Sequence, residues 1–504
     1  MLCRLHTAAV IGVEAVPVEV EVDAGRGLPG FHLVGLPDNA VREGAVRIRT
    51  ALAHSGFDLG SVRLTVNLAP AELRKDGASF DLPIALGGLL ARGLATFDPQ
   101  QTLLTGELAL DGRLRPIRGA LTVAEGARRW GFSALVLPRA NASEAALVAG
   151  LRVLGADSLS EAVALLSGAV PATPTPPPPT PEPSRVGEPD FAEVCGQAAA
   201  RRAAEVAAAG GHNLLLIGPP GAGKTMIARR IAGVLPAMSA DEAIETTRVH
   251  SVAGRLNEVG LVSRRPFRAP HHTCSSAGLI GGGSHPRPGE VSLAHNGVLF
   301  LDELPEFQRP TLEALRQPLE SGDVTIVRAR LALTFPARFM LVAAMNPCPC
   351  GYRGSEIRCC TCGEKEAQRY TGRISGPLLD RFDIFVRVSP VPTAQVLAPG
   401  TNEPSAALAA RVAAARERQR QRYARGAIHC NAQLSPRALQ RHVPLSPPSR
   451  RLIEQHAQRH GLSARAVHRC CRVARTLADL EPTEQVGEEH VALALALQQE
   501  RWLG

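Results

Sequence analysis

The stretch that decides the fold is Asn213-Leu-Leu-Leu-Ile-Gly-Pro-Pro-Gly-Ala-Gly-Lys-Thr-Met-Ile-Ala-Arg-Arg-Ile-Ala232. Its first five residues form an apolar run that predicts a buried strand, and Met226 to Ala232 predict a helix. The glycine-rich loop between them has the spacing of a P-loop, in which backbone N–H groups turn onto the phosphates of a nucleotide. The stretch therefore predicts that the chain binds ATP or GTP.

Lysine is rare in this chain, which makes the lysine of the loop informative. Only three of the 56 basic residues are lysines. Lys224 places a compact charge beside the β- and γ-phosphates, where the planar fork of arginine would not fit, and the Thr225 hydroxyl is expected to bind Mg²⁺. The residues expected to bind the nucleotide are Gly218, Pro219, Pro220, Gly221, Ala222, Gly223, Lys224 and Thr225.

The composition is that of an ordinary globular protein. The chain has 504 residues, 45% of them hydrophobic and 20% charged, which predicts two to four domains. A net charge of +9 permits a polyanionic partner without requiring one. Because neither a signal-peptide pattern nor a long apolar stretch is present, we expect a cytoplasmic protein without membrane contact, whose eleven cysteines are thiols or metal ligands.

A proline-rich segment divides the chain. Eight of the thirteen residues from Pro171 to Pro183 are proline, which predicts an extended tether and, less favoured, an SH3-type ligand. Before it, alternating valines from Val16 to Val22 predict a half-buried strand, and helical patterns cover about 38–55, 80–92 and 119–130. This region is predicted to be an α+β or α/β domain.

Strands that alternate with helices follow the tether and predict a parallel sheet covered on both faces. A long helix is expected over 405–425, followed by a small helical region. We therefore expect an N-terminal domain over 1–168, a linker over 169–189, an α/β nucleotide-binding core over 190–390 and a helical domain over 391–504.

Polar residues end two further apolar strands of this core. Asp302 and Glu303 follow Val298-Leu-Phe-Leu301, and Asn346 follows Met340-Leu-Val-Ala-Ala-Met345. Asp302 is expected to hold Mg²⁺ and Glu303 to activate the attacking water, the alternative being an acidic pair that merely ends a strand. Asn346 is placed to reach the γ-phosphate or that water, and a structural role remains open for it.

An arginine between apolar residues is a candidate for transition-state stabilisation. Arg381 lies in Leu378-Leu-Asp-Arg-Phe-Asp383. An arginine supplied to the γ-phosphate of a neighbouring subunit stabilises the charge that develops during phosphoryl transfer. A purely structural role for Arg381 also remains open.

These residues together resemble the AAA+ superfamily and, more narrowly, the magnesium-chelatase-like ComM/YifB family, from residue 1 to about 500. The motifs that carry the resemblance are Asp190-Phe-Ala-Glu-Val-Cys-Gly-Gln197, Ala207-Ala-Ala-Gly-Gly-His-Asn213, Arg265-Pro-Phe-Arg-Ala-Pro-His-His272, Pro288-Gly-Glu-Val-Ser-Leu-Ala-His295 and Asn346-Pro-Cys-Pro-Cys-Gly351. The family is similar to chelatase ATPase subunits and MCM helicases, which act as ATP-driven rings, and its members are associated with DNA branch migration during natural transformation.

The resemblance assigns a role to each candidate. It implies that Lys224 and Thr225 belong to Walker A, Asp302 and Glu303 to Walker B, and Asn346 to sensor 1. Arg381 would be the arginine finger and Arg465 the sensor 2 arginine, with a solvated helix-face arginine as the alternative for Arg465. A finger acting between subunits implies a homo-oligomer, most simply a hexamer.

A predicted hairpin suits a DNA motor. Asp323 to Phe335 alternates as two strands with Arg328 and Arg330 near the turn, and we expect these arginines to contact DNA phosphates. An exposed hairpin tip without a partner is the alternative. Arginines also crowd the helix after residue 405, where a solvated face is favoured: Arg411, Arg416, Arg418, Arg420, Arg422 and Arg425.

Five cysteines fall between residues 348 and 362. Cys348, Cys350, Cys360 and Cys362 are candidates for a tetrahedral Zn²⁺ site, with Cys359 to spare. Because the spacing is C-x-C rather than C-x₂-C, free thiols remain an equal alternative. For the pair His271-His272, a structural loop role is favoured over metal binding or a position facing the nucleotide.

In the N-terminal region, two motifs are Arg74-Lys-Asp-Gly-Ala-Ser79 and Leu104-Thr-Gly-Glu-Leu-Ala-Leu-Asp-Gly-Arg-Leu-Arg-Pro-Ile117. They resemble the Lon protease domain, which is related to ribosomal protein S5 domain 2, and Ser79 falls where that family has its nucleophile. The family's lysine base is expected near Leu121, yet no lysine occurs between Lys75 and Lys224. Proteolysis is therefore not expected, and the fold is predicted to serve DNA binding or assembly.

Three functions are compatible with these features. The favoured one is an ATP-hydrolysing ring that remodels branched or single-stranded DNA. The first alternative is an ATPase that drives metal insertion into a porphyrin, against which the Lon-like N-terminal domain speaks. The second is a non-catalytic DNA-binding scaffold, which the complete set of hydrolysis residues disfavours.

Overall fold

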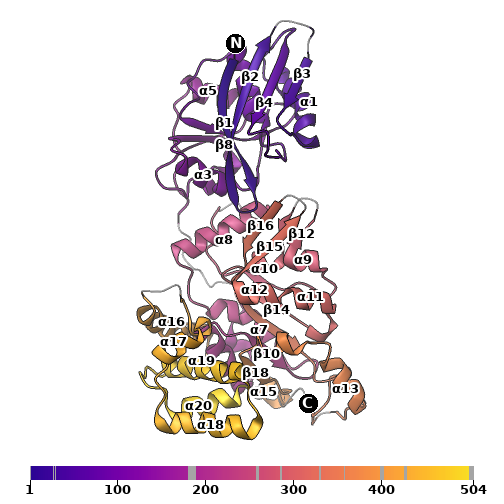
Figure 1. Cartoon of the computed structure of the whole chain (residues 1–504), viewed down its shortest axis with the longest axis vertical. Helices are drawn as coiled ribbons and strands as arrows, with labels where there is room; N and C mark the ends of the chain where they lie inside the picture. Colours follow the sequence, from indigo (N-terminus) through magenta and orange to yellow (C-terminus); the bar gives the residue numbers. More distant parts are fainter. Residues whose placement is uncertain are drawn as a thin grey trace. The chain divides into compact units, whose positions relative to one another are not determined.

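The computed structural model describes residues 2–25, 28, 30–179, 189–256, 260–283, 286–328, 331–356, 358–397, 402–424 and 428–498, with the side chains of Arg328, Leu331 and Val396 excepted (Figure 1). The chain forms two compact units that are not contiguous in sequence. Unit 1 comprises Met1–Glu182, Ala240–Ser263 and Val327–Phe335, and unit 2 comprises Pro183–Ser239, Arg264–Ile326 and Pro336–Gly504. Unit 1 thus includes two segments that lie well beyond its N-terminal part in the sequence.

Unit 1 is built on a seven-stranded mixed sheet with the order β3-β4-β2-β1-β5-β8-β9. Strand β2 pairs antiparallel with β1 and β4, whereas β5, β8 and β9 run parallel to β1. The strands are β1 (Leu2–Ile11), β2 (Glu14–Gly25), β3 (Gly30–Val34), β4 (Arg63–Ala69), β5 (Thr102–Leu104), β8 (Ala134–Pro138) and β9 (Arg152–Ala156), and β6 (Glu107–Leu108) pairs with β7 (Leu114–Arg115). The predicted alternating strand is confirmed in β2, where Val18, Val20 and Val22 are buried.

Helices cover both faces of this sheet. Residues of α1 (Asn39–His54), α2 (Asp81–Arg92) and α5 (Leu159–Ser167) join one apolar cluster, and residues of α3 (Ala120–Arg129) and α4 (Arg139–Ala145) join a second. Alternate residues of β8 divide between the clusters, because Val136 enters the first while Leu135 and Leu137 enter the second. The three helices predicted in this region are confirmed.

Helix α8 (Ala240–Ala253) belongs to unit 1 although it follows the P-loop in sequence. Arg248 of α8 pairs with Glu125 of α3 at 2.7 Å. The Ser251 hydroxyl donates to the Glu144 carboxylate, which also accepts from the Leu121 N–H at 2.7 Å. Burial raises the pKa of Glu144, and these two donors oppose that rise. The buried carboxylate therefore ties α8 to α3 and α4.

The proline-rich segment begins as a packed strip, which the prediction of an unpacked tether missed. The Val170 N–H donates to the Ala164 carbonyl at 3.3 Å, and the Thr175 N–H donates to the Val153 carbonyl of β9 at 2.8 Å. Ala172 packs against the first apolar cluster of unit 1. The segment accordingly adheres to its domain up to Thr175, and residues 180–188 of the predicted linker lie outside the described residues.

Unit 2 contains a five-stranded sheet with the order β11-β14-β17-β10-β18, in which every pairing is parallel. The strands are β10 (Leu214–Ile217), β11 (Phe267–Arg268), β14 (Val298–Leu301), β17 (Met340–Met345) and β18 (Ile384–Arg387). Strands β10, β14 and β17 are buried along their whole length, as expected for a sheet covered on both faces. The predicted α/β P-loop core is confirmed.

The remaining helices of unit 2 surround this sheet and continue into the C-terminal region. They are α6 (Ala198–Gly210), α7 (Lys224–Val234), α9 (Ser276–Ile280), α10 (Glu290–Leu293), α11 (Arg309–Ala314), α12 (Arg316–Ser321), α13 (Glu364–Thr371), α14 (Gly376–Leu379), α15 (Thr393–Leu397), α16 (Ser405–Arg422), α17 (Pro436–His442), α18 (Pro447–His460), α19 (Ala464–Leu480) and α20 (Glu488–Ala496). One apolar cluster runs from Phe191 to Leu497 and includes Val412 of α16 and Leu477 of α19. The sheet and the C-terminal helices thus share one hydrophobic core.

The arginines of α16 are bound within the protein, so the prediction of a solvated face was wrong for most of them. Arg411 pairs with Glu205 of α6 and with Glu403, and Arg416 donates to the Ala208 carbonyl at 3.0 Å. Arg418 and Arg422 donate to Asp479 of α19, and Arg420 pairs with Glu417 at 2.7 Å. Arg425 lies outside the described residues. Carboxylates and carbonyls on α6 and α19 explain the crowding of arginines on this helix.

Candidate functional site

The register of the parallel sheet brings three loops to one edge. Ile217 at the end of β10 pairs with Met345 at the end of β17, and Leu301 at the end of β14 pairs with Ala343. Gly218, Asp302 and Asn346 each follow directly after one of these strands. Because the carboxyl ends of parallel strands lie at the same edge of a sheet, the three loops meet there, as in other α/β ligand sites.

The P-loop leaves an open cradle above helix α7. Gly221 and Gly223 have φ angles of +76° and +89°, and a Cβ atom built on either would meet nothing within 4 Å. Gly218 is different, because a Cβ there would lie 2.1 Å from the Val388 carbonyl oxygen. Helix α7 begins at Lys224, so its first N–H groups lack intrahelical acceptors and point toward the open cradle. This arrangement fits the phosphates of a nucleotide.

Lys224 lies at the centre of the site. Its Nζ donates to the carbonyl oxygens of Gly218 and Pro219, at 2.7 and 2.9 Å, and to Oδ1 of Asn346 at 3.0 Å. Burial lowers the pKa of Lys224 to about 8, and the carboxylates of Asp302 and Glu303 oppose this shift. An anion placed beside Nζ would relieve the cost of burying this charge.

Thr225 and Asp302 meet where a divalent cation is expected. The Thr225 hydroxyl donates to Asp302 Oδ2 at 2.7 Å, and Asp302 Oδ1 accepts from the Glu303 N–H at 3.0 Å. A hydroxyl and a carboxylate are the hard oxygen ligands that Mg²⁺ uses at phosphate sites. The donor set therefore fits Mg²⁺.

Glu303 adopts a conformation that is unusual for its residue type. Its φ of +53° lies in the left-handed region, which costs a non-glycine residue about 1 kcal/mol or more. His272, in the loop after β11, places Nδ1 3.1 Å from Glu303 Oε2. The favoured interpretation of a purely structural histidine pair thus missed a contact between His272 and the candidate catalytic carboxylate. The neighbouring His271 bonds Thr273 at 2.9 Å instead.

The two candidate arginines lie apart from the residues around Lys224. Arg381 pairs with Glu320 of α12, and Arg465 Nη1 lies 3.7 Å from Asp380 Oδ2. Burial, and next the charge of Arg465, lowers the pKa of Arg381. Within the described part of the chain, no contact joins Arg381 or Arg465 to Lys224. Lys224, Thr225, Asp302 and Asn346 form one site, and the arginines lie outside it.

Sequence reasoning missed two residues that support the site. Gln197, with φ of +57°, donates from Nε2 to the Ala222 carbonyl of the P-loop at 3.0 Å. Burial raises the pKa of Tyr370 of α13 to about 12, and the backbone of Asn346 opposes part of that rise. Gln197 ends the motif Asp190–Gln197, and its place in that motif could have identified it from the sequence. No feature of the sequence indicated Tyr370.

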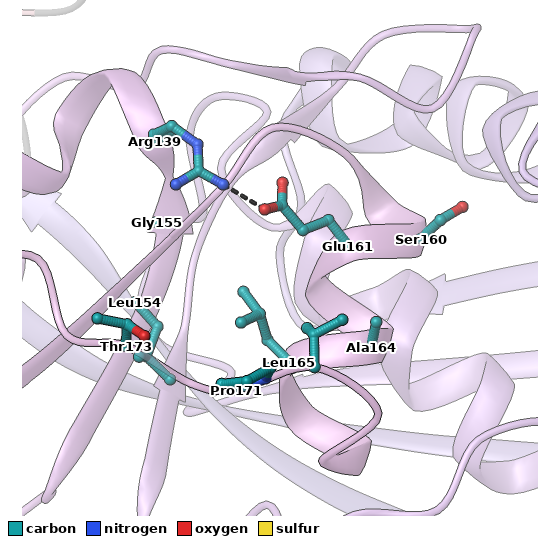
Figure 2. A pocket seen from close by; sticks show the side chains of 10 residues that line it. Arg139, Leu154, Gly155, Ser160, Glu161, Ala164, Leu165, Pro171 and Thr173 are labelled. Atoms are coloured by element: carbon teal, nitrogen blue, oxygen red, sulfur yellow. Dashed lines mark hydrogen bonds and ion pairs between the residues drawn. The ribbon is translucent and has the colours of Figure 1, made fainter.

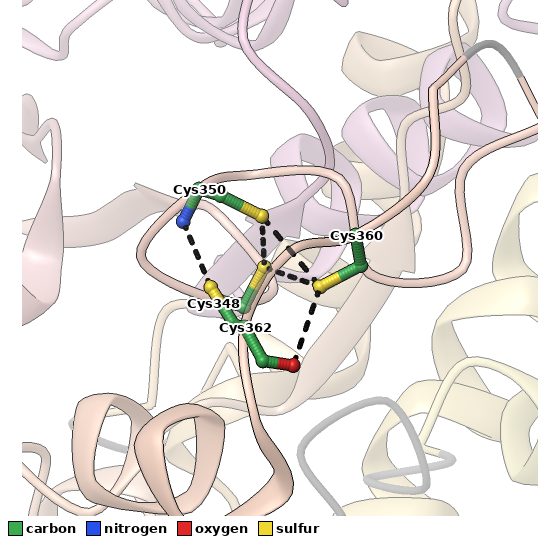
Figure 3. Close-up of side chains that lie close together, drawn as sticks. All are labelled: Cys348, Cys350, Cys360 and Cys362. Atoms are coloured by element: carbon green, nitrogen blue, oxygen red, sulfur yellow. Dashed lines mark hydrogen bonds between the residues drawn. The ribbon is translucent and has the colours of Figure 1, made fainter.

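Four of the five clustered cysteines converge (Figure 3). Their sulfur atoms all lie within 4.8 Å of one another: Cys348, Cys350, Cys360 and Cys362. These are the four that the sequence singled out as candidates for zinc, and Cys359, the predicted spare, is exposed.

The predicted hairpin is present in the structure. Strands β15 (Asp323–Arg328) and β16 (Leu331–Pro336) make a separate two-stranded sheet. Arg330 and the side chain of Arg328 lie outside the described residues. Their contact with DNA stays a prediction.

Unit 1 offers no arrangement for serine proteolysis among its described residues. Ser79 has no described contact with a lysine, and Lys75 is fully buried and donates to the Pro70 carbonyl. Leu121, near which the family's lysine was expected, is fully buried.

A cavity of about 520 Å³ lies in unit 1 between β9, α5 and the start of the proline-rich segment (Figure 2). Its polar wall is the ion pair of Arg139 and Glu161, and Leu165 and Pro171 line the apolar side. Because Arg139 also pairs with Asp157 at 2.6 Å, its charge is already neutralised. Among the described residues that line this cavity, the charged side chains are Arg139 and Glu161, and they pair with each other.

No helix in the described ranges is both apolar enough and long enough to cross a membrane.

Three family models match the chain. They are described as subunit ChlI of Mg-chelatase over residues 20–141, magnesium chelatase subunit ChlI over 190–396, and the ChlI C-terminal region over 402–498. The match over residues 20–141 shows that the N-terminal region also occurs in chelatase subunits. The argument that this region speaks against a chelatase is therefore wrong.

Curated relatives match almost the whole chain. A protein named YifB from Salmonella typhimurium is 42% identical, over 98% of this chain and 96% of its own length. YifB of Escherichia coli is 43% identical with the same coverage. The competence protein ComM of Haemophilus influenzae is 43% identical, over 98% of this chain and 97% of its own. The chain therefore belongs to the YifB/ComM family of magnesium-chelatase ChlI-like AAA ATPases.

Proposed function

We propose that this protein hydrolyses ATP and uses the energy to remodel DNA, moving branched joints of recombination intermediates during natural transformation. The observation that carries the ATPase part is the convergence of Lys224, Thr225, Asp302 and Asn346 at one edge of the sheet. The DNA part rests on similarity to a protein named for competence and on the predicted arginine hairpin.

Each residue of the site has a defined task in this proposal. Lys224 Nζ exchanges its carbonyl contacts for phosphate oxygens, and the N–H groups of the P-loop bind the same phosphates. Thr225 and Asp302 hold Mg²⁺, which when bound neutralises charge on the phosphates. Asn346 orients the attacking water, and Glu303 accepts a proton from it at a carboxylate oxygen.

His272 keeps the base in place. Its Nδ1 lies 3.1 Å from Glu303 Oε2, on the loop that follows the neighbouring strand of the sheet. Glu303 is otherwise half-exposed, so a fixed partner limits the positions that its carboxylate can take. His272 is a positioning residue in this scheme.

The site needs a second subunit. Arg381 and Arg465 are separate from Lys224 in one chain, and AAA+ proteins complete their sites at interfaces between subunits, so we propose a homo-oligomeric ring, most simply a hexamer. Arg381→Ala and Lys224→Ala are then each inactive alone. Mixing the two proteins creates interfaces with an intact P-loop and an intact finger, and part of the ATP turnover returns. Absence of any recovery from mixed oligomers would argue that Arg381 acts within its own chain.

The decisive experiment measures ATP turnover and strand movement together, on a four-way DNA junction. Wild-type protein is expected to move the junction with ATP, and Lys224→Ala is expected to do neither. The double variant Arg328→Ala/Arg330→Ala should keep basal ATP turnover and lose at least about tenfold of its DNA stimulation. Arg420→Ala is the matched control, because the Arg420 side chain is exposed and pairs with Glu417 of its own helix. Steady ATP consumption without movement of any junction or fork would make the motor assignment wrong.

A chelatase-type ATPase that drives metal insertion into a porphyrin is the second candidate. The descriptions of all three matching family models favour it, since each refers to magnesium chelatase. It requires a porphyrin and separate partner subunits. Stimulation of ATP turnover by a porphyrin with those subunits, and none by DNA, would support this candidate over the first.

A further inference from the structure

The loop between β17 and α13 holds four thiols in a compact group (Figure 3). Cys348 Sγ lies 3.4 Å from Cys350 Sγ and 3.6 Å from Cys360 Sγ, and Cys350 Sγ lies 3.6 Å from Cys360 Sγ. The fourth sulfur, of Cys362, accepts a hydrogen bond from the Cys350 N–H at 3.4 Å. Two arms of the loop, one following β17 and one preceding α13, therefore supply two thiols each.

The spacing fits one tetrahedral ion. Zinc–sulfur bonds of about 2.3 Å at tetrahedral angles put sulfur atoms about 3.8 Å apart. The three sulfur–sulfur separations given above are close to this value, and all four sulfurs fall within 4.8 Å of one another. This volume suits a single metal ion and leaves no room for a cluster of several irons. Four soft sulfur ligands in a tetrahedral arrangement favour Zn²⁺.

The loop has little else to hold it. Its described residues from Asn346 to Gly363 contain neither helix nor strand. Loops of this length are rarely ordered without a cross-link or a packed core of their own. Cys348 is completely buried, and Cys350, Cys360 and Cys362 are half-buried, so the sulfurs themselves form the centre of the loop.

The same loop contacts the nucleotide site from two directions. A Cβ atom at Gly351 would lie 2.5 Å from Cδ of Pro220, so the loop backbone lies directly against the P-loop. Asn346, two residues before Cys348, accepts the hydrogen bond from Lys224. On the other arm, α13 begins two residues after Cys362, and the backbone of Asn346 acts to lower the pKa of its Tyr370 against the larger effect of burial.

Two arginines complete this support. Arg387 of β18 donates to the Gly354 carbonyl of the loop. Arg373, just after α13, pairs with Glu306 at 2.9 Å and donates to the Pro305 carbonyl at 3.3 Å, in the turn after Asp302 and Glu303. Both ends of the cysteine loop thus reach the loops that are expected to bind and cleave ATP.

We propose that Cys348, Cys350, Cys360 and Cys362 bind one structural Zn²⁺, and that this ion fixes Asn346 and Pro220 in the geometry of the ATP site. The metal site stands on the sulfur geometry alone, whereas its bracing role rests on the proposed ATPase function. The ion takes no part in hydrolysis, because its four positions are filled by thiolates and none is open for water.

The test begins with metal content. Elemental analysis of purified full-length protein should find about one zinc per chain, and less than about one-tenth equivalent would overturn the site. Reconstitution with Co²⁺ should give thiolate-to-metal charge-transfer absorption. Iron in place of zinc, with the absorption of an iron–sulfur cluster, would also overturn the proposal.

Adjacent cysteines provide a matched pair of variants. Cys360→Ser should lose zinc, whereas Cys359→Ser changes an exposed thiol outside the group and should keep it. Loss of zinc from both, or from neither, would contradict the assignment. Circular dichroism and oligomeric state establish whether Cys360→Ser folds, and chelation of zinc from folded wild-type protein gives the same comparison without a mutation.

The bracing role has its own measurement. Removal of zinc should lower ATP turnover about tenfold or more, since a displacement of about 1 Å in a catalytic group has effects of this size. Lys224→Ala should abolish turnover and retain full zinc content, which separates failure of the ATPase proposal from failure of the metal site. Zinc-free protein that turns over ATP at the wild-type rate would overturn the bracing role and leave a metal of purely local effect.

Discussion

Substitution of one glycine tests how closely the cysteine loop determines the shape of the P-loop. Gly351 has φ of +86°, where alanine costs about 1 kcal/mol. The new Cβ would also lie 2.5 Å from Cδ and 2.9 Å from Cγ of the Pro220 ring. Ordinary contact between carbon atoms needs about 3.5 Å, so the loop and Pro220 must separate by about 1 Å. We expect Gly351→Ala to be destabilised by about 1–3 kcal/mol.

The larger effect should fall on catalysis. A shift of about 1 Å at the P-loop or at Asn346 should lower kcat for ATP by about 10- to 100-fold. Steady-state phosphate release measures kcat, binding of a fluorescent nucleotide measures affinity, and thermal unfolding measures stability. Zinc content should stay at the wild-type level, because Gly351 supplies no ligand.

Gly363 gives the control within the same loop. Its φ is −70° and a Cβ there would meet nothing within 4 Å, so Gly363→Ala should cost less than about 1 kcal/mol and leave kcat unchanged. If Gly351→Ala hydrolyses ATP as fast as Gly363→Ala does, the cysteine loop does not determine the geometry of the P-loop and the reasoning fails.

Three further substitutions test other parts of the molecule. His272→Ala should lower kcat about tenfold at an unchanged KM for ATP, because Glu303 loses its partner, while His271→Ala should have no effect; equal effects would refute the positioning role. Asp479→Ala should lower the free energy of unfolding by about 3–5 kcal/mol, because it leaves the guanidinium groups of Arg422 and Arg475 without their buried carboxylate. A change below about 1 kcal/mol would contradict this. Burial raises the pKa of Asp81 from 3.8 to about 6 despite its arginine partner, so its contribution to stability is greatest below pH 3.8 and declines as the pH rises to about 6. Chemical unfolding across that range should show a decline that is missing in Asp81→Asn.

Local patterns predicted the elements that form the site. The apolar runs before Gly218, Asp302 and Asn346 became buried parallel strands, because a strand covered on both faces needs a continuous apolar sequence. The sequence also predicts the four cysteines as candidate metal ligands, because soft ligands at short spacing are a local signal. The four sulfurs come together because the loop folds back on itself. The C-x-C spacing of the cysteines permits this fold but does not require it.

Contacts between distant segments escaped prediction. His272 and Glu303 lie on different loops, and only the parallel pairing of β11 with β14 brings them together. The membership of α8 in unit 1 depends on Glu144 and Ser251, which are separated by 107 positions. The arginines of α16 looked solvated because their carboxylate partners lie on other helices. Periodicity describes which face of an element is apolar and carries no information on the partner that covers it.

The core that joins the sheet of unit 2 to the C-terminal helices has a consequence for dissecting this protein. The matched ATPase model ends at residue 396 and the C-terminal model begins at 402, which invites a cut between them. Such a cut would strip Val412 and Leu477 from the cluster that also contains the P-loop strand, and it would expose apolar surface along α6. A fragment ending near residue 396 should therefore aggregate or unfold. Because one core joins the sheet to the C-terminal helices, we expect unit 2 to unfold in a single cooperative transition. The boundary between the two matched sequence families, at residues 396–402, is therefore not a boundary between independently folding domains.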